Sequence, residues 1–446
     1  MAQPAIQATP PPGLESKRPW YFPRTFEAFD FGPFRWYMGA MLWWNAAMSM
    51  QMIVRGFLAY NLTGEFIWLG IVGLGQAVPM LLLSPFGGVI ADRTSKRFVL
   101  QIGQSFSLLI AVIVAGLLFA DLLNRWHLVA ASIAQGVMMA LVMPSRQAFL
   151  PEVVGMKRLM NAIPLQTAGM NVMQIIGPAF GGPLIDWIGP GSVYSIMALM
   201  YAMSVLTLFR VKPLSPEQLE ASWAQAGGAS RGRMARRPAG PGGAPRPGAL
   251  SELKAGLAYV FRDRAVLGIL SFAFLGSLLG MPIRMLLPGY VAVVFGETGT
   301  TLGLMQMGMG VGALSGALAL ATLRMTKHRA LLLAGSAILM GLSMIAFSFT
   351  ENFIIGWLAL MVIGIGSAGR QAMSQILVQE YVHDEYRGRV MSLFMMQFSL
   401  MSAGTFIVAY YMDQFGAQKS ILALGVALIL ATFVYVALNG SFRRLK

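Results

Sequence analysis

The sequence contains no cysteine, only three histidines and few charged residues. Of its 446 residues, 11% are charged, and only 18 are acidic. Without cysteine the chain has no disulfide, no thiolate metal site and no cysteine nucleophile. His127, His328 and His383 all fall between the apolar segments, so none of them is placed to activate a serine that lies inside an apolar segment. The sequence also has no metal-ligand cluster. We therefore expect that the protein is not an enzyme and that it has no metal site and no cofactor.

Apolar side chains are abundant. Hydrophobic residues make up 56% of the chain and the mean hydropathy is +0.64, which leaves too little polar surface for a soluble globule of this size. Apolar runs of roughly 20 to 30 residues recur, and each is long enough to cross about 30 Å of hydrocarbon. We predict an all-α membrane protein with 12 transmembrane helices in two sets of six. The runs are 36–62, 66–91, 98–120, 126–150, 160–187 and 191–211, then 265–295, 301–323, 330–349, 353–380, 388–412 and 418–438.

The positive charges are distributed unevenly along the chain, whose net charge is +15. In the predicted loops and at the run ends, Arg125 and Lys419 lie on one side of the membrane. The other Lys and Arg residues, apart from the four arginines deep within the runs, lie on the opposite side. The positive-inside rule then places both termini and the central loop in the cytoplasm of a multi-pass cell-membrane (inner-membrane) protein. We expect membrane lipids, rather than nucleic acid, as partners of the basic surface.

Composition also divides the chain into domains. The stretch 213–250 is rich in Gly, Pro and Arg, which predicts a flexible basic linker. Leu253, Leu257 and Phe261 then form one apolar stripe of a short amphipathic helix. We predict a cytoplasmic tail and interfacial segment at 1–34, a six-helix bundle at 35–212, the linker at 213–250, a second bundle with its preceding helix at 251–440, and a cytoplasmic tail at 441–446.

The two sets of six are internal repeats. Ser145–Ala148 (SRQA) corresponds to Gly369–Ala372 (GRQA), and Asp186–Gly189 (DWIG) corresponds to Asp413–Gly416 (DQFG). Two repeats in the same orientation, joined by a long loop, imply a central cavity between the halves.

Four arginines lie deep within the apolar runs, away from the run ends, without Asp or Glu at comparable depth. Because a charge in hydrocarbon costs several kcal/mol, each is a functional candidate. The repeat sorts them into an outer or central pair, Arg55 with Arg284, and an inner pair, Arg146 with Arg370. For the first pair, substrate contact or an outer gate competes with helix-end contacts or snorkelling. For the second, a cytoplasmic gate competes with substrate contact or static pairing.

Residues that share a helical face with an arginine are candidate substrate contacts. Methionine adapts to shape, tryptophan offers flat apolar area, and arginine binds a carboxylate, phosphate or catecholate bidentately. This mixture suits an amphipathic ligand. The predicted contacts are Trp44, Met48 and Gln51 on the face of Arg55, and Gln135 and Met139 on the face of Arg146.

The loop after the second run, GGVIADRTSKR at 87–97, resembles the signature of the major facilitator superfamily: glycine, three residues, Asp-Arg, one residue, glycine and two basic residues. It departs at Ser95, where the family has glycine. The resemblance implies the major facilitator fold, with two six-helix repeats around a central cavity. It also implies a cytoplasmic latch made by Gly88, Asp92, Arg93, Lys96 and Arg97, to which Glu152 and Glu380 add acidic partners near Arg146 and Arg370.

The fifth run carries Gly177, Pro178, Gly181 and Gly182, which resemble the core of the antiporter motif and allow close helix packing. With PSRQAFLPEVV at 144–154, these features resemble the exporter branch that includes the enterobactin exporter and macrolide-efflux proteins. The resemblance implies export of an amphipathic small molecule by alternating access, coupled to protons. We expect a monomer.

No carboxylate lies in mid-membrane to carry a proton. The candidates near helix ends are Asp30, Asp121, Glu152 and Glu380. Because a transporter of lipophilic cations would favour an acidic cavity, we expect a neutral or anionic substrate. The alternatives are a lysophospholipid or lipid flippase, an uptake transporter of the same fold, and a non-transporting membrane scaffold.

Overall fold

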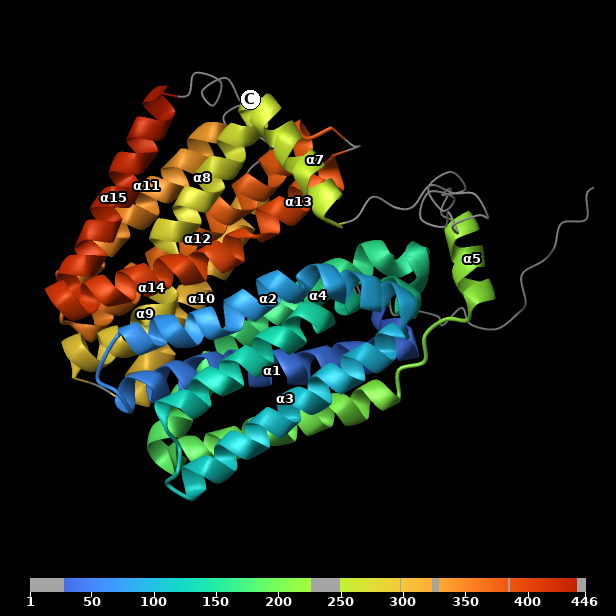
Figure 1. Cartoon of the computed structure of the whole chain (residues 1–446), viewed down its shortest axis with the longest axis horizontal. Coiled ribbons are helices and arrows are strands. Elements are labelled where there is room, and N and C mark those ends of the chain that lie inside the picture. The colour runs from blue at the N-terminus through green and yellow to red at the C-terminus, as the bar shows by residue number, and fades with distance from the viewer. Residues whose placement is uncertain (1–27, 226–248, 297, 323–328, 384–385, 439–446) are drawn as a thin grey trace, which may run out of the picture.

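The computed structural model describes residues 28–225, 249–296, 298–322, 329–383 and 386–438 (Figure 1). These residues form helices joined by short turns. The first half comprises α1 (Gly32–Asn61), α2 (Ile67–Arg93), α3 (Lys96–Phe119), α4 (Arg125–Phe209) and α5 (Pro216–Gln225). The second comprises α7 (Ala249–Arg262), α8 (Arg264–Gly280), α9 (Pro282–Tyr290), a π-helix η2 (Val291–Phe295), α10 (Gly299–Thr322), α11 (Arg329–Ser348), α12 (Phe353–Tyr381), α13 (Arg387–Met395), α14 (Gln397–Phe415) and α15 (Ala417–Leu438).

The two halves form two bundles that meet along α2 with α14 and α4 with α10. Figure 1 shows the bundles in blue-green and in yellow-red, diverging toward α5, α7 and α13. We call that side of the molecule the linker end, and the opposite side, where α1 leads into α2, the distal end. The cytoplasmic position predicted for the linker end stays a prediction.

The helix α4 is bent twice. It runs for 85 residues, which is far longer than one membrane crossing, but Gly155 and Gly189 have φ of 70° and 79°. Glycine has no Cβ and adopts this left-handed region readily, so the chain turns back at each position. α4 therefore carries the fourth, fifth and sixth predicted runs.

All twelve predicted runs lie on helices, and the all-α membrane architecture is confirmed. Ten segments of the described residues are long and apolar enough to span a membrane. One of them, Arg158–Phe209, contains the bend at Gly189, and α1, with 30 residues, is not among the ten. The count of twelve spans stays a prediction.

Three details differ from the expectation. The seventh run is not one long helix, because Pro282 has no N–H to continue α8 and instead starts α9. The eleventh run is divided between α13 and α14 at Met396. Residues 216–225 of the predicted linker form α5, while 226–248, the tail 1–27 and the tail 441–446 lie outside the described residues.

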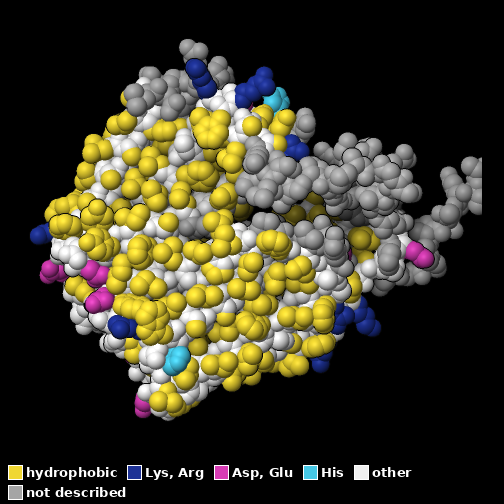
Figure 2. Space-filling view, viewed as in Figure 1, with side chains coloured by type: hydrophobic (Ala, Val, Ile, Leu, Met, Phe, Trp, Pro, Cys, Tyr) yellow, Lys and Arg dark blue, Asp and Glu magenta, His cyan; other side chains and the backbone are white. Residues whose placement is uncertain are grey.

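Apolar side chains cover much of the outer surface. Figure 2 shows hydrophobic groups across the visible face, with most acidic groups on the left and basic groups near the top and lower right. Large side chains such as Phe180, Leu199 and Leu430 are about 60% exposed. A continuous apolar surface of this extent is typical of contact with lipid.

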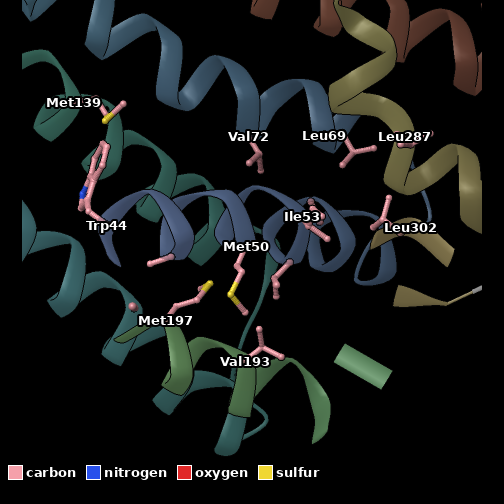
Figure 3. Close-up of a cluster of buried hydrophobic side chains, with 14 of the residues drawn as sticks. Trp44, Met50, Ile53, Leu69, Val72, Met139, Val193, Met197, Leu287 and Leu302 are labelled. Carbon is pink, nitrogen blue, oxygen red and sulfur yellow. The ribbon is translucent and has the colours of Figure 1, made fainter. Parts of the chain in front are cut away.

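The core is centred on α1 and continues from one half to the other. In Figure 3, Trp44 and Met50 of α1 face the first half, while Ile53 lies toward Leu287 and Leu302 of the second. The distal parts of both bundles therefore share one packed apolar core.

Candidate functional site

A small pocket, with a volume of about 30 Å³, lies between the two halves near the distal end. We call it the interhalf pocket. Its walls come from α1 and α2 of the first half and from α9 and α10 of the second. The lining residues are Met52, Arg55, Gly56, Leu69, Val72, Gly73, Arg284, Met285, Pro288 and Gln306. Most are apolar or glycine, so the two arginines stand out as its charged groups.

Arg55 enters this pocket from α1. The residue is 8% exposed, and its Nη2 donates to Gln76 Oε1 of α2 at 2.5 Å. An amide oxygen satisfies one N–H but leaves the positive charge without a counter-charge. Arg55 can therefore offer its charge to a ligand by exchanging one neutral acceptor.

Arg284 enters from the second half, in the first turn of α9. Its Nη2 donates to Gln174 Oε1 of α4 at 3.2 Å, a bond that crosses between the halves. The break before Pro282 places this residue at a helix N-terminus, and Gln306 of α10 donates to the Arg284 carbonyl oxygen at 3.3 Å. The partial positive charge of a helix start adds to that of the guanidinium.

The charge of the pocket is positive and unopposed. In the described part of the chain the ion pairs are Lys96 with Glu152 and Arg329 with Glu380, and neither includes a pocket arginine. Among the described residues, no carboxylate lines the pocket. Two guanidinium groups, Arg55 buried and Arg284 half-buried, have no acidic partner here and so favour a bound anion, such as a carboxylate or a phosphate.

The other predicted contacts of α1 lie elsewhere. Trp44 packs under Arg146, whose Cζ is 5.1 Å from the indole centroid, and Gln51 Oε1 accepts from the Tyr201 hydroxyl at 3.0 Å. Met48 is half-buried. None of these three residues lines the interhalf pocket. They lie closer to the start of α1 than Arg55 does, where this helix packs against other helices of its own half. Their role in substrate binding stays a prediction.

The predicted contacts of α4 are buried inside the first half. Gln135 Nε2 donates to Ser107 Oγ of α3 at 3.4 Å, and Met139 belongs to the apolar core. Both are less than 5% exposed and lie outside the pocket lining. They would reach a substrate only in another conformation, so their role also stays a prediction.

Arg146 and Arg370 occupy equivalent positions in the repeats but have different surroundings. Arg146 Nη2 donates to Met170 Sδ at 3.4 Å. Arg370 is fully buried, and its Nη1 donates to the Ala273 carbonyl at 3.3 Å, while its Nε and Nη2 have no partner among the described residues. Gly276 makes room for it, since a Cβ there would lie 2.8 Å from the Arg370 Cδ.

The glutamates of the predicted cytoplasmic gate bond to lysine and arginine of their own half. Lys96 Nζ donates to Glu152 Oε1 at 2.6 Å, between α3 and α4. Arg329 pairs with Glu380 in the equivalent place, between α11 and α12. Neither glutamate bonds Arg146 or Arg370 in this conformation, so the gate stays a prediction.

The remaining latch residues lie where α2 ends. Arg97 Nη2 donates to the Phe209 carbonyl at 2.5 Å, which ties α3 to the end of α4. The surroundings of Gly88 and the side chains of Asp92 and Arg93 lie outside the described residues. Their latch role also stays a prediction. Two of the four carboxylates predicted as proton carriers, Asp30 and Asp121, are exposed near helix ends.

The glycine motif of α4 lies where this helix approaches two others. Gly177 faces Ser49 of α1, and Gly181 faces Met50 of the same helix. Gly182 faces the other half, where a Cβ would lie 2.6 Å from Gly303 Cα of α10. The packing role is therefore shared between a contact within one half and a contact between the halves.

Sequence reasoning missed the amides around the pocket arginines. Gln76, Gln174 and Gln306 are uncharged, and only charged side chains were counted as anomalies in the apolar runs. Isolated glutamines in such runs, together with Pro282 and Pro288 close to Arg284, were the available signal.

Comparisons with known proteins agree with this architecture. A family model described as Major Facilitator Superfamily matches residues 36–405. The Staphyloferrin A transporter of Staphylococcus aureus is 24% identical, covering 85% of this chain and 89% of that protein. Macrolide efflux protein A of Streptococcus pyogenes is 22% identical, covering 89% and 95%. A lysophospholipid transporter of Photorhabdus laumondii is 26% identical, covering 64% of each chain.

Solved structures share the fold. A nucleoside transporter has a TM-score of 0.71 at 11% identity, covering 91% of this chain and 98% of its own. A D-xylose-proton symporter has a TM-score of 0.66 at 13% identity, covering 94% and 99%. At such identities the likeness concerns the fold alone.

Proposed function

Because the chain belongs to the major facilitator superfamily, we propose that it is a secondary active transporter that exports an anionic or neutral amphipathic small molecule across the cell membrane. The family and the fold establish a multi-pass membrane transporter rather than an enzyme. The substrate class, the direction and coupling to protons belong to the proposal.

The observation that carries the substrate class is the pairing of Arg55 and Arg284 in the interhalf pocket. One guanidinium comes from each half, and no carboxylate of the described residues lines the pocket. The walls are otherwise mainly apolar, including Met52, Val72 and Pro288. The chemistry of this lining suits a molecule with an apolar body and a negative or strongly hydrogen-bonding group.

The hydrogen bonds of the two arginines suggest how binding couples to movement. Arg284 bonds Gln174 of the other half, so an anion that takes over this guanidinium releases one bond between the halves. Arg55 bonds Gln76 within its own half, so a ligand there would leave the interface unchanged. Substrate binding would thus favour separation of the halves at Arg284, as alternating access requires.

Export is supported by the exporter-like residues of α4 and by relatives whose names describe efflux. The few basic residues near the distal end, Arg125 and Lys419, support an extracellular position for that end and a cytoplasmic position for the termini. The transporter would then bind substrate from the cytoplasm in the conformation described.

A second candidate is lysophospholipid transport. The basic pocket suits a phosphate, and one relative is named as a lysophospholipid transporter. Apolar residues on the pocket walls, such as Leu69 and Val72, would accompany an acyl chain. The two candidates differ in the ligand that the same two arginines would hold.

The test is transport by purified protein in liposomes, with staphyloferrin A, a macrolide and a lysophospholipid as separate probes, with and without a proton gradient. We expect Arg55→Ala and Arg284→Ala to lower transport of the accepted probe about tenfold or more, since a charge-assisted hydrogen bond contributes about 1.5–3 kcal/mol. Arg→Lys variants should recover part of the rate.

Arg125→Ala is the matched control, because Arg125 packs on Trp68 and does not line the pocket. Normal rates and affinities for the accepted probe in both pocket variants would reject the proposed site. Preference for the lysophospholipid alone would support the second candidate. With erythromycin as the macrolide, whose tertiary amine is cationic at neutral pH, transport of this probe alone would reject an anionic or neutral substrate.

A further inference from the structure

Asp413, at the end of α14 in the second half, bonds to the start of α2 in the first half. Its Oδ1 accepts from the Phe66 backbone N–H at 2.7 Å and its Oδ2 from that of Ile67 at 2.8 Å. The first N–H groups of a helix have no partner inside the helix. The carboxylate therefore caps α2 from the opposite bundle.

Asp186, in the first half, makes the equivalent contact in the opposite direction. Its two carboxylate oxygens accept from the backbone N–H groups of Gly299 and Thr300 at 2.9 and 2.7 Å. The hydroxyls of Thr298 and Thr300 also donate to it, at 2.7 and 2.5 Å. These groups form the start of α10, the second long helix of the second bundle, as α2 is of the first.

The two contacts are related by the internal repeat. Each aspartate is the first residue of a D-x-x-G segment whose glycine turns the chain with positive φ, 79° at Gly189 and 90° at Gly416. The sequence alone identified the pair as repeated. The structure adds that each carboxylate bonds the other bundle.

Close backbone packing accompanies each cap. Beside Asp186, a Cβ on Gly303 would lie 2.5 Å from the Pro178 carbonyl oxygen. Between α2 and α14, the helices that Asp413 joins, a Cβ on Gly70 would lie 2.7 Å from the Phe406 Cα. The capped helices are therefore in contact with the bundle that caps them, and separation of the bundles at the distal end would break every one of these bonds.

We propose that Asp186 and Asp413 form a pair of reciprocal latches that hold the distal end closed. These two contacts are distinct from the cytoplasmic latch predicted from the sequence. Each latch combines hydrogen bonds to otherwise unpaired N–H groups with a negative charge at the positive end of a helix. Both aspartates are exposed to solvent, so water can replace the bonds when the halves separate. The latches act on the conformational equilibrium and do not depend on which substrate is carried.

The experiment measures distances between spin labels by pulsed electron resonance in nanodiscs. Because the chain has no cysteine, labels can be introduced without background. The pair Leu62→Cys and Glu351→Cys reports the distal end, and Ser215→Cys with Arg262→Cys reports the linker end. Both pairs are measured in the parent protein, in Asp186→Ala, in Asp413→Ala and in the double variant.

We expect each single variant to raise the ratio of distal-open to distal-closed protein about fivefold, the typical effect of losing a helix cap, and the double variant to raise it about twentyfold or more. The linker-end distances should shorten in the same population. The control is Glu65→Ala, because Glu65 is a distal carboxylate that bonds Trp68 within its own half; its distances should match those of the parent.

Unchanged distal distances in a folded double variant would overturn the proposal, and so would an equal shift in Glu65→Ala. If the double variant does not fold, the two single variants decide the matter by the same criterion. The readout needs no substrate, so failure of the latches and failure of the proposed transport function are distinguishable.

Discussion

The two ends of the molecule use carboxylates differently. At the distal end, Asp186 and Asp413 accept hydrogen bonds from the opposite half. At the linker end, Glu152 and Glu380 pair with basic residues of their own half. Bonds across the interface hold the halves together, whereas bonds within each half strengthen a bundle and leave it free to move. The comparison explains how one end can stay closed while the halves diverge at the other.

The largest effect should come from filling the distal interface. We expect Gly303→Ala to shift the equilibrium toward distal-open protein by about tenfold or more, because the new methyl group would collide with the backbone of Pro178 and Gly182. The same distal spin-label pair measures the shift. Gly335→Ala is the control, since its Cβ would meet nothing within 4 Å, and a similar shift there would contradict the role of this contact.

A smaller effect should come from keeping one capping bond of a latch while removing its charge and its second bond. Asparagine carries no charge and has one acceptor oxygen, so it can keep only one of the two backbone bonds that each carboxylate accepts. We therefore expect Asp186→Asn and Asp413→Asn to raise the ratio of distal-open to distal-closed protein about two- to threefold, less than the alanine variants do. High salt should reduce the difference between each asparagine variant and the parent, because salt screens the charge. Asparagine variants that open as far as the alanine variants would show that a single neutral capping bond does not hold the latch.

The smallest effect should come from the linker end. Glu152→Gln removes the charge that Lys96 contacts within the first half. Partly exposed ion pairs contribute about 0–1 kcal/mol, so the melting temperature should fall by only a few degrees at most. The distal distances should be unchanged, and a clear change in them would mean that the two ends do not differ as described.

Much of the fold was predictable, because long apolar runs indicate where helices cross a membrane. The break before Pro282 was missed, since membrane helices often tolerate proline. The repeat paired Arg55 with Arg284, and both residues line one pocket in the structure. It also identified the two D-x-x-G segments, but not their bonds, because Asp413 caps a helix 347 residues away. Such contacts depend on how the bundles dock, which local patterns do not encode.

The duplication of the cap has a mechanical consequence. One attachment joins α14 to α2, and the other joins α4 to α10, at a separate place on the interface. A single attachment point would leave one bundle free to swivel against the other. Two points leave only rotation about the line that joins them, so the internal repeat restricts how the bundles can twist, and loss of either cap would permit a twist before any gap opens.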